Sequence, residues 1–248
     1  MGSRYQRHLS LPDFTRLHQE RLRAAHVLVV GAGGLAAPVL TYLAGSGVGD
    51  VTVMDDDQID ETNLQRQVLF TVADIGRSKA VVAAERVRAL NPDVRVHPSA
   101  TRFSTTTPPQ IRGDLNLVVD CSDNLPTRYL LESWALSAGA TYVWAAIGQY
   151  AGRCSVVSPQ VGACFECVYG PADKVAEWPS GVQSGVFGPV CGMVGALAAA
   201  EAIKVLTGLG EPLVGRMAMV DAWSGDLTQI AIHPDPHCRT CAHRSMAT

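Results

Sequence analysis

The chain has 248 residues, 47 % of them hydrophobic, which suits one large α/β domain or two small ones with a sizeable core. A formal net charge of −3 without a basic run disfavours nucleic-acid binding. The polar N-terminus MGSRYQRHLSLPDF does not resemble a secretory signal, and an odd cysteine count of 7 disfavours a disulfide framework. We therefore expect a cytoplasmic protein.

Strand-like and helix-like segments alternate through the first part of the chain. The expected strands are His26–Val30, Val51–Asp55, Val94–His97, Leu115–Cys121 and Thr141–Ile147. The expected helices are Gly34–Ser46, Lys79–Leu90 and Leu125–Ala138. This βαβ alternation predicts an α/β fold with a doubly wound, mainly parallel, Rossmann-like sheet.

The second part of the chain departs from this rhythm. Arg153–Ser158 predicts another strand, and Met217–Asp221 with Leu227–Ile232 predicts a hairpin that forms a C-terminal antiparallel extension. Tyr169–Pro189 is rich in Gly, Pro and Ser, which is typical of a functional or mobile loop. In the Ala-rich segment 186–208, two charged residues interrupt the apolar run and favour a buried core helix over a membrane span.

These elements predict a single domain over residues 1–248. We divide it into an N-terminal arm and helix (1–24), a nucleotide-binding part (25–148) and a C-terminal part (149–248). The C-terminal part would hold the sheet extension, the long loop and a cysteine-rich metal site.

A glycine-rich turn, GAGGLA, separates the first expected strand from the first helix. Gly31, Gly33 and Gly34 let the main chain turn tightly and approach a phosphate, which the helix N-terminus attracts. Asp55, at the end of the second strand, lies where such folds bind ribose hydroxyl groups. These features fit NAD as well as ATP, and they also fit a turn that binds nothing.

The residues that follow favour ATP over NAD. Arg66 offers a bidentate fork to phosphate and Lys79 a point charge, neither of which an NAD pyrophosphate needs. The alternatives are a surface salt bridge for Arg66 and a solvated helix face for Lys79. After the fourth strand, Asp123 is placed to hold Mg²⁺, while Asn124 begins the next helix or touches the nucleotide.

Two CxxC pairs give the most specific local signal. Their spacing predicts a closed, tetrahedral, structural Zn²⁺ site formed by Cys164, Cys167, Cys238 and Cys241. This site would fasten the C-terminal segment to the middle of the chain. The other cysteines, Cys121, Cys154 and Cys191, are expected to be small core residues.

The chain resembles the MoeB/ThiF group of adenylyltransferases, relatives of the ubiquitin-activating enzymes, over essentially its whole length. The resemblance rests on RYQRH, GAGGLA, DDDQIDETNLQRQ, IGRSKA, DCSDN, the CxxC pairs and GALAAAEAIKVLTG, in that order. It implies a homodimer that uses Mg²⁺ and ATP to adenylate the C-terminal glycine carboxylate of a small ubiquitin-fold sulfur-carrier protein with a Gly-Gly terminus. A separate sulfur donor, a sulfurtransferase or a cysteine desulfurase, would then form the thiocarboxylate.

The resemblance also implies roles for single residues. Asp55 would bind the ribose, and Asp123 would serve Mg²⁺ and the reacting carboxylate. The phosphates would be bound by Asn63, Arg66 and Lys79. Arg7 matches an arginine that, in the family, reaches the ATP of the other subunit, and this assignment rests on the resemblance alone.

One departure from the family bears on covalent chemistry. Relatives that bond to the carrier have a cysteine shortly before the stretch matched here by residues 184–189, whereas the matching position here is Gly181. We therefore expect the enzyme to stop at the acyl-adenylate, as in the MoeB-like branch. Cys191 is then the remaining candidate for a covalent role.

Three other functions stay open. The first is an NAD-dependent oxidoreductase. The second is an ATP-dependent activator of another acceptor, such as a small peptide, a biosynthetic acid or tRNA. The third is a non-catalytic scaffold with a vestigial site. The two extra cations disfavour the first, and the lack of a basic patch disfavours tRNA. The intact set of site residues disfavours the scaffold.

Overall fold

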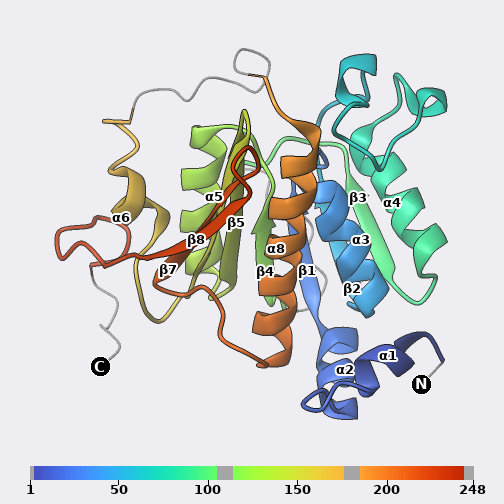
Figure 1. Ribbon diagram of the computed structural model, residues 1–248, viewed down its shortest axis with the longest axis horizontal. Helices are drawn as coiled ribbons and strands as arrows, with labels where there is room; N and C mark the ends of the chain where they lie inside the picture. The colour runs from blue at the N-terminus through green and yellow to red at the C-terminus, as the bar shows by residue number, and fades with distance from the viewer. Residues whose placement is uncertain (1–2, 105–113, 176–184, 243–248) are drawn as a thin grey trace.

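The computed structural model describes residues 3–104, 114–175 and 185–242. An eight-stranded sheet forms its centre, in the order β3-β2-β1-β4-β5-β6-β7-β8 (Figure 1). The strands from β3 to β5 in this order pair in parallel, and β6, β7 and β8 continue the sheet in antiparallel pairing. The predicted doubly wound sheet with an antiparallel extension is confirmed.

The elements have the following bounds. The strands are β1 His26–Val30, β2 Asp50–Met54, β3 Arg95–Ser99, β4 Leu117–Asp120, β5 Thr141–Gly148, β6 Ala151–Val157, β7 Arg216–Asp221 and β8 Asp226–Ala231. The α-helices are α1 Gln6–Leu9, α2 Arg16–Ala24, α3 Ala36–Ser46, α4 Lys79–Leu90, α5 Leu125–Ser137, α6 Phe165–Tyr169 and α8 Gly188–Thr207. Short 3₁₀ helices span Ser3–Tyr5, Glu61–Asn63 and Val72–Asp74.

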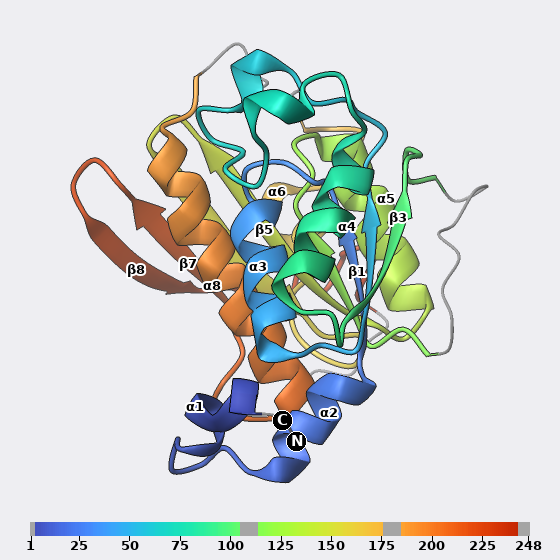
Figure 2. The same cartoon turned by 90° about the vertical axis from the view of Figure 1, so that its right-hand side faces the viewer.

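Apart from the edge strand β3, the parallel strands are largely buried on both faces, which explains their mainly apolar sequence. Along β1, Val27 and Val29 belong to the core on the side of α3, α4 and α8, whereas Leu28 and Val30 belong to the core on the side of α5 (Figure 2). Because side chains alternate across a strand, this one short strand contributes to both cores.

Local signals set several helix ends. The hydroxyl of Ser78 accepts a hydrogen bond from the amide of Val81 at the start of α4, and the helix ends at Leu90, as predicted. Helix α3 begins at Ala36, two residues later than expected, because the preceding Gly33 and Gly34 belong to the glycine-rich turn. It ends at Ser46, and the following Gly47, with a φ of +79°, forms a left-handed cap.

The predicted loop Tyr169–Pro189 is only partly described. Helix α6 ends at Tyr169, the first residue of the predicted loop. Helix α8 begins at Gly188, one residue before the predicted end of the loop. Gly181, the position of the missing cysteine, lies outside the described residues. Val186 forms an isolated bridge with Gln149, which places this end of the segment beside the turn between β5 and β6.

Helix α8 is long and apolar enough to cross a membrane by length and composition, but half of its most apolar window is buried within the fold. It packs against α3, β5 and β6. The carboxylate of Glu201 is buried, accepts a hydrogen bond from the amide of Leu213 at 2.8 Å and lies 2.5 Å from the ammonium of Lys204. A helix that is apolar on nearly all sides, and whose buried carboxylate has hydrogen-bond and ion-pair partners, has the features of a core helix.

The order of the strands fixes where a ligand can bind. From β1 the chain moves outward to β2 and β3, and it then returns to place β4 on the other side of β1. In doubly wound sheets a crevice opens outside the carboxyl ends of the strands at such a reversal. The glycine turn after β1 and the segment after β4 therefore both border this crevice.

Candidate active site

A cleft lies at this reversal, and most of the predicted nucleotide-binding residues line it. Its predicted members are Gly31, Gly33, Gly34, Asp55, Arg66, Lys79, Asp123 and Asn124. Residues far apart in sequence are thus brought together by the ends of β1, β2 and β4 and the start of α4.

The glycine turn is in close contact with the segment after β4. Gly31 has a φ of +89°, and a Cβ placed on it would lie 2.6 Å from the carbonyl oxygen of Cys121. A Cβ on Gly34 would lie 2.7 Å from the Sγ of Cys191. Both positions therefore need glycine, one for its backbone conformation and both for space.

Asp55 is held against the glycine turn. Its carboxylate accepts hydrogen bonds from the amide of Ala32 at 2.7 Å and from the amide of Asp57 at 2.8 Å. Burial raises the pKa of Asp55, although these two amides and the nearby Lys79 oppose the rise. The carboxylate is placed next to the turn, as expected of a ribose acceptor.

Lys79 is not a solvated helix residue. Its side chain is 8 % exposed, and its ammonium lies 2.8 Å from the carboxylate of Asp57. A buried lysine requires such a partner. Asp57 is therefore part of the site, and Asp56, which also lines the cleft, forms a more exposed pair with Arg102, 3.4 Å away.

Arg66 lines the cleft beside the glycine turn, where its carbonyl oxygen would lie 3.2 Å from a Cβ placed on Gly34. Its guanidinium donates a hydrogen bond to the carbonyl oxygen of Thr62 at 3.1 Å. Asn63 is not among the residues that line the cleft. Its side-chain oxygen instead accepts a hydrogen bond from the amide of Asp60 at 3.3 Å, which closes the short helix Glu61–Asn63.

Asp123 is exposed in the cleft, and Asn124 has a defined structural role. The side chain of Asn124 accepts a hydrogen bond from the amide of Thr127 at 3.0 Å and caps α5. The other Asn124 group, its side-chain amide, lies 3.4 Å from the carboxylate of Asp123. Of the two expectations for Asn124, the start of the helix is confirmed.

Arg7 lies away from the cleft of its own chain. It is exposed on α1, which together with α2 lies beyond the end of the sheet where β1 begins (Figures 1 and 2). The cleft lies at the other end of β1. Arg7 therefore needs a second chain to meet a nucleotide, and its assignment stays a prediction.

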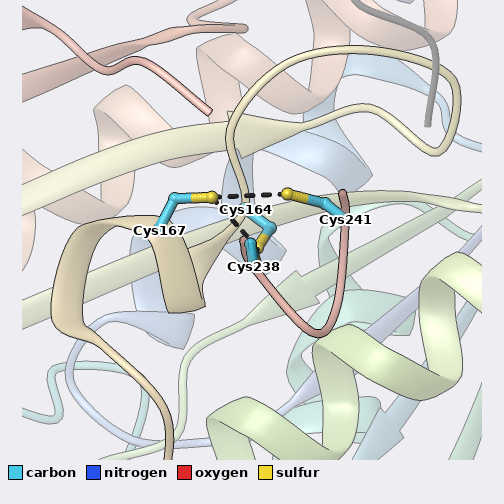
Figure 3. A group of neighbouring side chains, drawn as sticks. All are labelled: Cys164, Cys167, Cys238 and Cys241. Carbon is cyan, nitrogen blue, oxygen red and sulfur yellow. Dashed lines mark hydrogen bonds between the residues drawn. The ribbon is translucent and has the colours of Figure 1, made fainter. Parts of the chain in front are cut away.

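The four cysteines of the CxxC pairs form one cluster (Figure 3). The Sγ atoms of Cys164 and Cys238 are 3.4 Å apart, those of Cys167 and Cys241 are 3.3 Å apart, and those of Cys164 and Cys167 are 3.7 Å apart. Tetrahedral zinc with Zn–S bonds of ~2.3 Å sets sulfur atoms about 3.8 Å apart, so the four thiols fit this ion.

The structure adds site residues that the sequence reasoning missed. The cleft is also lined by Gln67, Thr101, Arg102, Phe103 and Arg128. Arg128 lies on the buried side of α5, the helix that begins at the site. A charged residue at such a position is a sequence signal that could have predicted a site residue. Cys191, which also lines the cleft, is 1 % exposed, and burial raises its pKa to about 11. The expectation that Cys191 is a small buried residue is confirmed.

Residues 5–240 match the ThiF family. The chain is 42 % identical to the sulfur carrier protein adenylyltransferase of Thermus thermophilus, covering 96 % of this chain and 90 % of that protein. It is 39 % identical to the SAMP-activating enzyme E1 of Haloferax volcanii, covering 96 % and 88 %. It is 41 % identical to the probable adenylyltransferase/sulfurtransferase MoeZ of Mycobacterium tuberculosis, of which it spans 61 %.

Solved structures support the fold. The Escherichia coli protein MccB, crystallised with ATP, superposes with a TM-score of 0.82 at 24 % identity, covering 97 % of this chain and 74 % of that one. This likeness extends over the parallel sheet and the antiparallel extension alike. On the family match and the similarity to its relatives, the chain belongs to the ThiF family and is an adenylyltransferase.

Proposed function

We propose that this enzyme transfers the adenylyl group of ATP to the C-terminal glycine carboxylate of a small ubiquitin-fold sulfur-carrier protein. The observation that carries the proposal is the convergence of Arg66, Lys79 and Asp123 on one cleft beside the glycine turn. A dehydrogenase has no use for this set. The name of the Thermus thermophilus relative, a sulfur carrier protein adenylyltransferase, supports the acceptor.

The reaction needs no general base, because the acceptor carboxylate is ionised at neutral pH. A carboxylate oxygen attacks the α-phosphorus, the bond from that phosphorus to the bridging oxygen breaks, and pyrophosphate leaves with the electron pair. The protein would contribute positioning and charge neutralisation. Asp55 would orient the ribose, and Arg66 and Lys79 would balance the charge of the departing pyrophosphate.

Asp123 would hold Mg²⁺, which supplies positive charge beside the phosphates. Its exposed carboxylate fits this ion, since Mg²⁺ is bound in such sites by one or two carboxylates together with phosphate oxygens. The four-cysteine cluster would hold a structural Zn²⁺, because four thiolates leave no open position for a substrate.

The proposal extends to partners. The enzyme would act as a homodimer in which Arg7 of one chain reaches the ATP of the other. A separate sulfur donor would then replace the adenylate. Mixing Arg7→Ala with Asp123→Ala, each inactive alone, would restore activity if Arg7 acts across chains, because one site of each mixed dimer would be intact.

Pyrophosphate exchange is the direct test of the reaction. Radiolabelled pyrophosphate should enter ATP only when enzyme, Mg²⁺ and a carrier protein with a free Gly-Gly terminus are all present. The same carrier without its last glycine is the matched control. Absence of exchange with the intact carrier, combined with exchange on a short peptide or a biosynthetic acid, would transfer the activity to one of the other acceptors.

A further inference from the structure

A buried charged cluster lies directly behind Asp123. It consists of Asp120 at the end of β4, Arg128 in the first half of α5 and Tyr142 on β5. The side chain of Arg128 is 2 % exposed, that of Asp120 is fully buried, and Tyr142 is fully buried. The proposed chemistry uses none of the three.

The cluster holds both polar main-chain groups of Ser122, the residue before Asp123. The carboxylate of Asp120 accepts a hydrogen bond from the amide of Ser122 at 2.8 Å. The guanidinium of Arg128 donates to the carbonyl oxygen of Ser122 and lies 3.5 Å from the second carboxylate oxygen of Asp120. The two peptide groups on either side of Ser122 are thus held, the first through its N–H and the second, which leads into Asp123, through its carbonyl oxygen.

Tyr142 completes the cluster from the neighbouring strand. Its hydroxyl group donates a hydrogen bond to the carboxylate of Asp120 at 2.5 Å. Burial and the nearby Asp120 carboxylate raise the pKa of Tyr142, so the phenol remains a donor at neutral pH. On the other side, the amide of Cys121 donates to the carbonyl oxygen of Val30 at 2.8 Å, which ties the same turn to the end of β1.

The side chain of Asp123 is held far less firmly than its main chain. It is exposed, and its contact with the side-chain amide of Asn124 is long, at 3.4 Å. A carboxylate in this situation is free to meet a cation, while the turn that carries it cannot shift. Such an arrangement is what a preorganised charged group requires.

A buried ion pair is a costly way to gain stability, because apolar residues of similar volume often serve as well. The guanidinium also balances the Asp120 carboxylate, which would otherwise place a second uncompensated charge close to Asp123. We propose that Arg128, held by Asp120 and Tyr142, is a positioning residue that fixes the main chain at Asp123 for Mg²⁺ and ATP. The proposal rests on the role of Asp123 proposed above.

The test compares Arg128→Lys and Tyr142→Phe with the wild-type enzyme. Lysine keeps the charge but cannot contact Ser122 and Asp120 with one planar fork. We expect kcat of pyrophosphate exchange to fall about 10- to 100-fold, since small misplacements of reacting groups have effects of this order. The KM for ATP should stay within about twofold. The Mg²⁺ concentration that gives half-maximal rate should rise severalfold, and Tyr142→Phe should show smaller changes in the same direction.

Glu201→Gln is the matched control, because Glu201 is a buried carboxylate paired with Lys204 on α8, away from the residues that line the cleft. It should lower the melting temperature while leaving the Mg²⁺ dependence and kcat per folded enzyme unchanged. If Arg128→Lys behaves like this control, the positioning role is wrong. Should Arg128→Lys fail to fold, Tyr142→Phe, which removes one oxygen atom, decides by the same criteria.

The Mg²⁺ dependence is also measured without any acceptor, as the rise in melting temperature that ATP causes at increasing Mg²⁺. A wild-type enzyme that shows this rise but no carrier-dependent exchange would refute the proposed acceptor only. The positioning role would then be judged on the shift of this curve in Arg128→Lys, and an unshifted curve would overturn it.

Discussion

The two halves of the sheet use their side chains in opposite ways. In the parallel half, the interiors of β1 and β4 are apolar and acidic residues follow the carboxyl ends of β2 and β4, where Asp55 and Asp123 line the cleft. In the antiparallel half, β8 is exposed along its whole length, including Leu227 and Ile230. From this difference we expect the chemistry to lie in the first half, whereas the two cysteine pairs follow β6 and β8 of the second half. Damage to the two halves should therefore have different signatures.

The largest expected effect is on catalysis, from Asp123→Ala. We expect the exchange rate to fall by about 10²–10³ or more, because an electrostatic anchor in the site is lost. The melting temperature should barely change, since Asp123 is exposed. Exchange kinetics and thermal unfolding measure the two properties, and near-wild-type exchange would contradict the Mg²⁺ assignment.

The next largest effect is on stability, from Cys238→Ser. We expect one zinc per chain in the wild-type protein, lost in this variant together with several kcal/mol of stability, because apparent zinc-binding free energies reach about 10 kcal/mol. Elemental analysis and thermal unfolding provide the readout. Cys154→Ala, at a buried cysteine outside the cluster, should keep the metal. If the wild-type protein, purified without chelator, contained no zinc, the proposed Zn²⁺ site would be wrong.

Gly34→Ala should affect both properties moderately. The added Cβ would lie 2.7 Å from the Sγ of Cys191 and 3.2 Å from the carbonyl oxygen of Arg66, so we expect a loss of about 1–3 kcal/mol and weaker ATP binding. Adding Cys191→Ala should recover part of the loss. Gly45→Ala is the control, because nothing lies within 4 Å of its Cβ position in α3. It should gain up to about 1 kcal/mol. A double variant no better than Gly34→Ala alone would show that Cys191 is not the obstacle.

A smaller effect should follow acidification. The pKa of Asp55 lies above the ordinary 3.8, so ATP binding should weaken as the pH falls toward it, when the carboxyl group loses its charge. The effect of Asp55 protonation on folding stability has the opposite sign. A raised pKa means that the folded state binds the proton more tightly, so protonation of Asp55 favours folding. Calorimetry should therefore show weaker binding before the protein unfolds. Adenosine, which has the ribose but no phosphate, is the control ligand, and pH-independent adenosine binding would contradict the role of Asp55.

The smallest effect is expected from Cys191→Ser. Cys191 is buried with a pKa raised to about 11, so it supplies almost no thiolate at neutral pH. Adenylated carrier should form as in the wild type. Mass spectrometry should find no thiol-sensitive adduct between enzyme and carrier, and an adduct that disappears in Cys191→Ser would show that this cysteine is the nucleophile.

Local patterns predicted much of the fold because their signals are short-range. The C-terminal end of α4 follows from Asn91-Pro92, which is legible in the sequence, and the structure adds the Ser78 cap at its start. Strand β3 was harder, because it includes Pro98, which a strand tolerates at the edge of a sheet. Helix α6 was missed because five residues show no periodicity.

The site was predictable where one residue type has one purpose, as in the CxxC pairs and the glycine turn. It was not predictable where a contact depends on the tertiary fold. The partner of Lys79 is Asp57, 22 residues earlier. The contact of Arg128 with Ser122 depends on how α5 leaves β4. No spacing rule encodes either contact.

The four-cysteine cluster also bears on how the chain is made. Its two pairs are separated by 74 residues, so at about 5–20 residues per second the second pair leaves the ribosome roughly 4–15 s after the first. Throughout that interval only Cys164 and Cys167, two of the four cysteines of the cluster, are present. The parallel strands β1 to β5 are synthesised earlier and can pair in the meantime. We therefore expect the cluster to form only after Cys241 has been synthesised, and oxidation of the first two thiols or a shortage of the proposed Zn²⁺ should interfere within that interval.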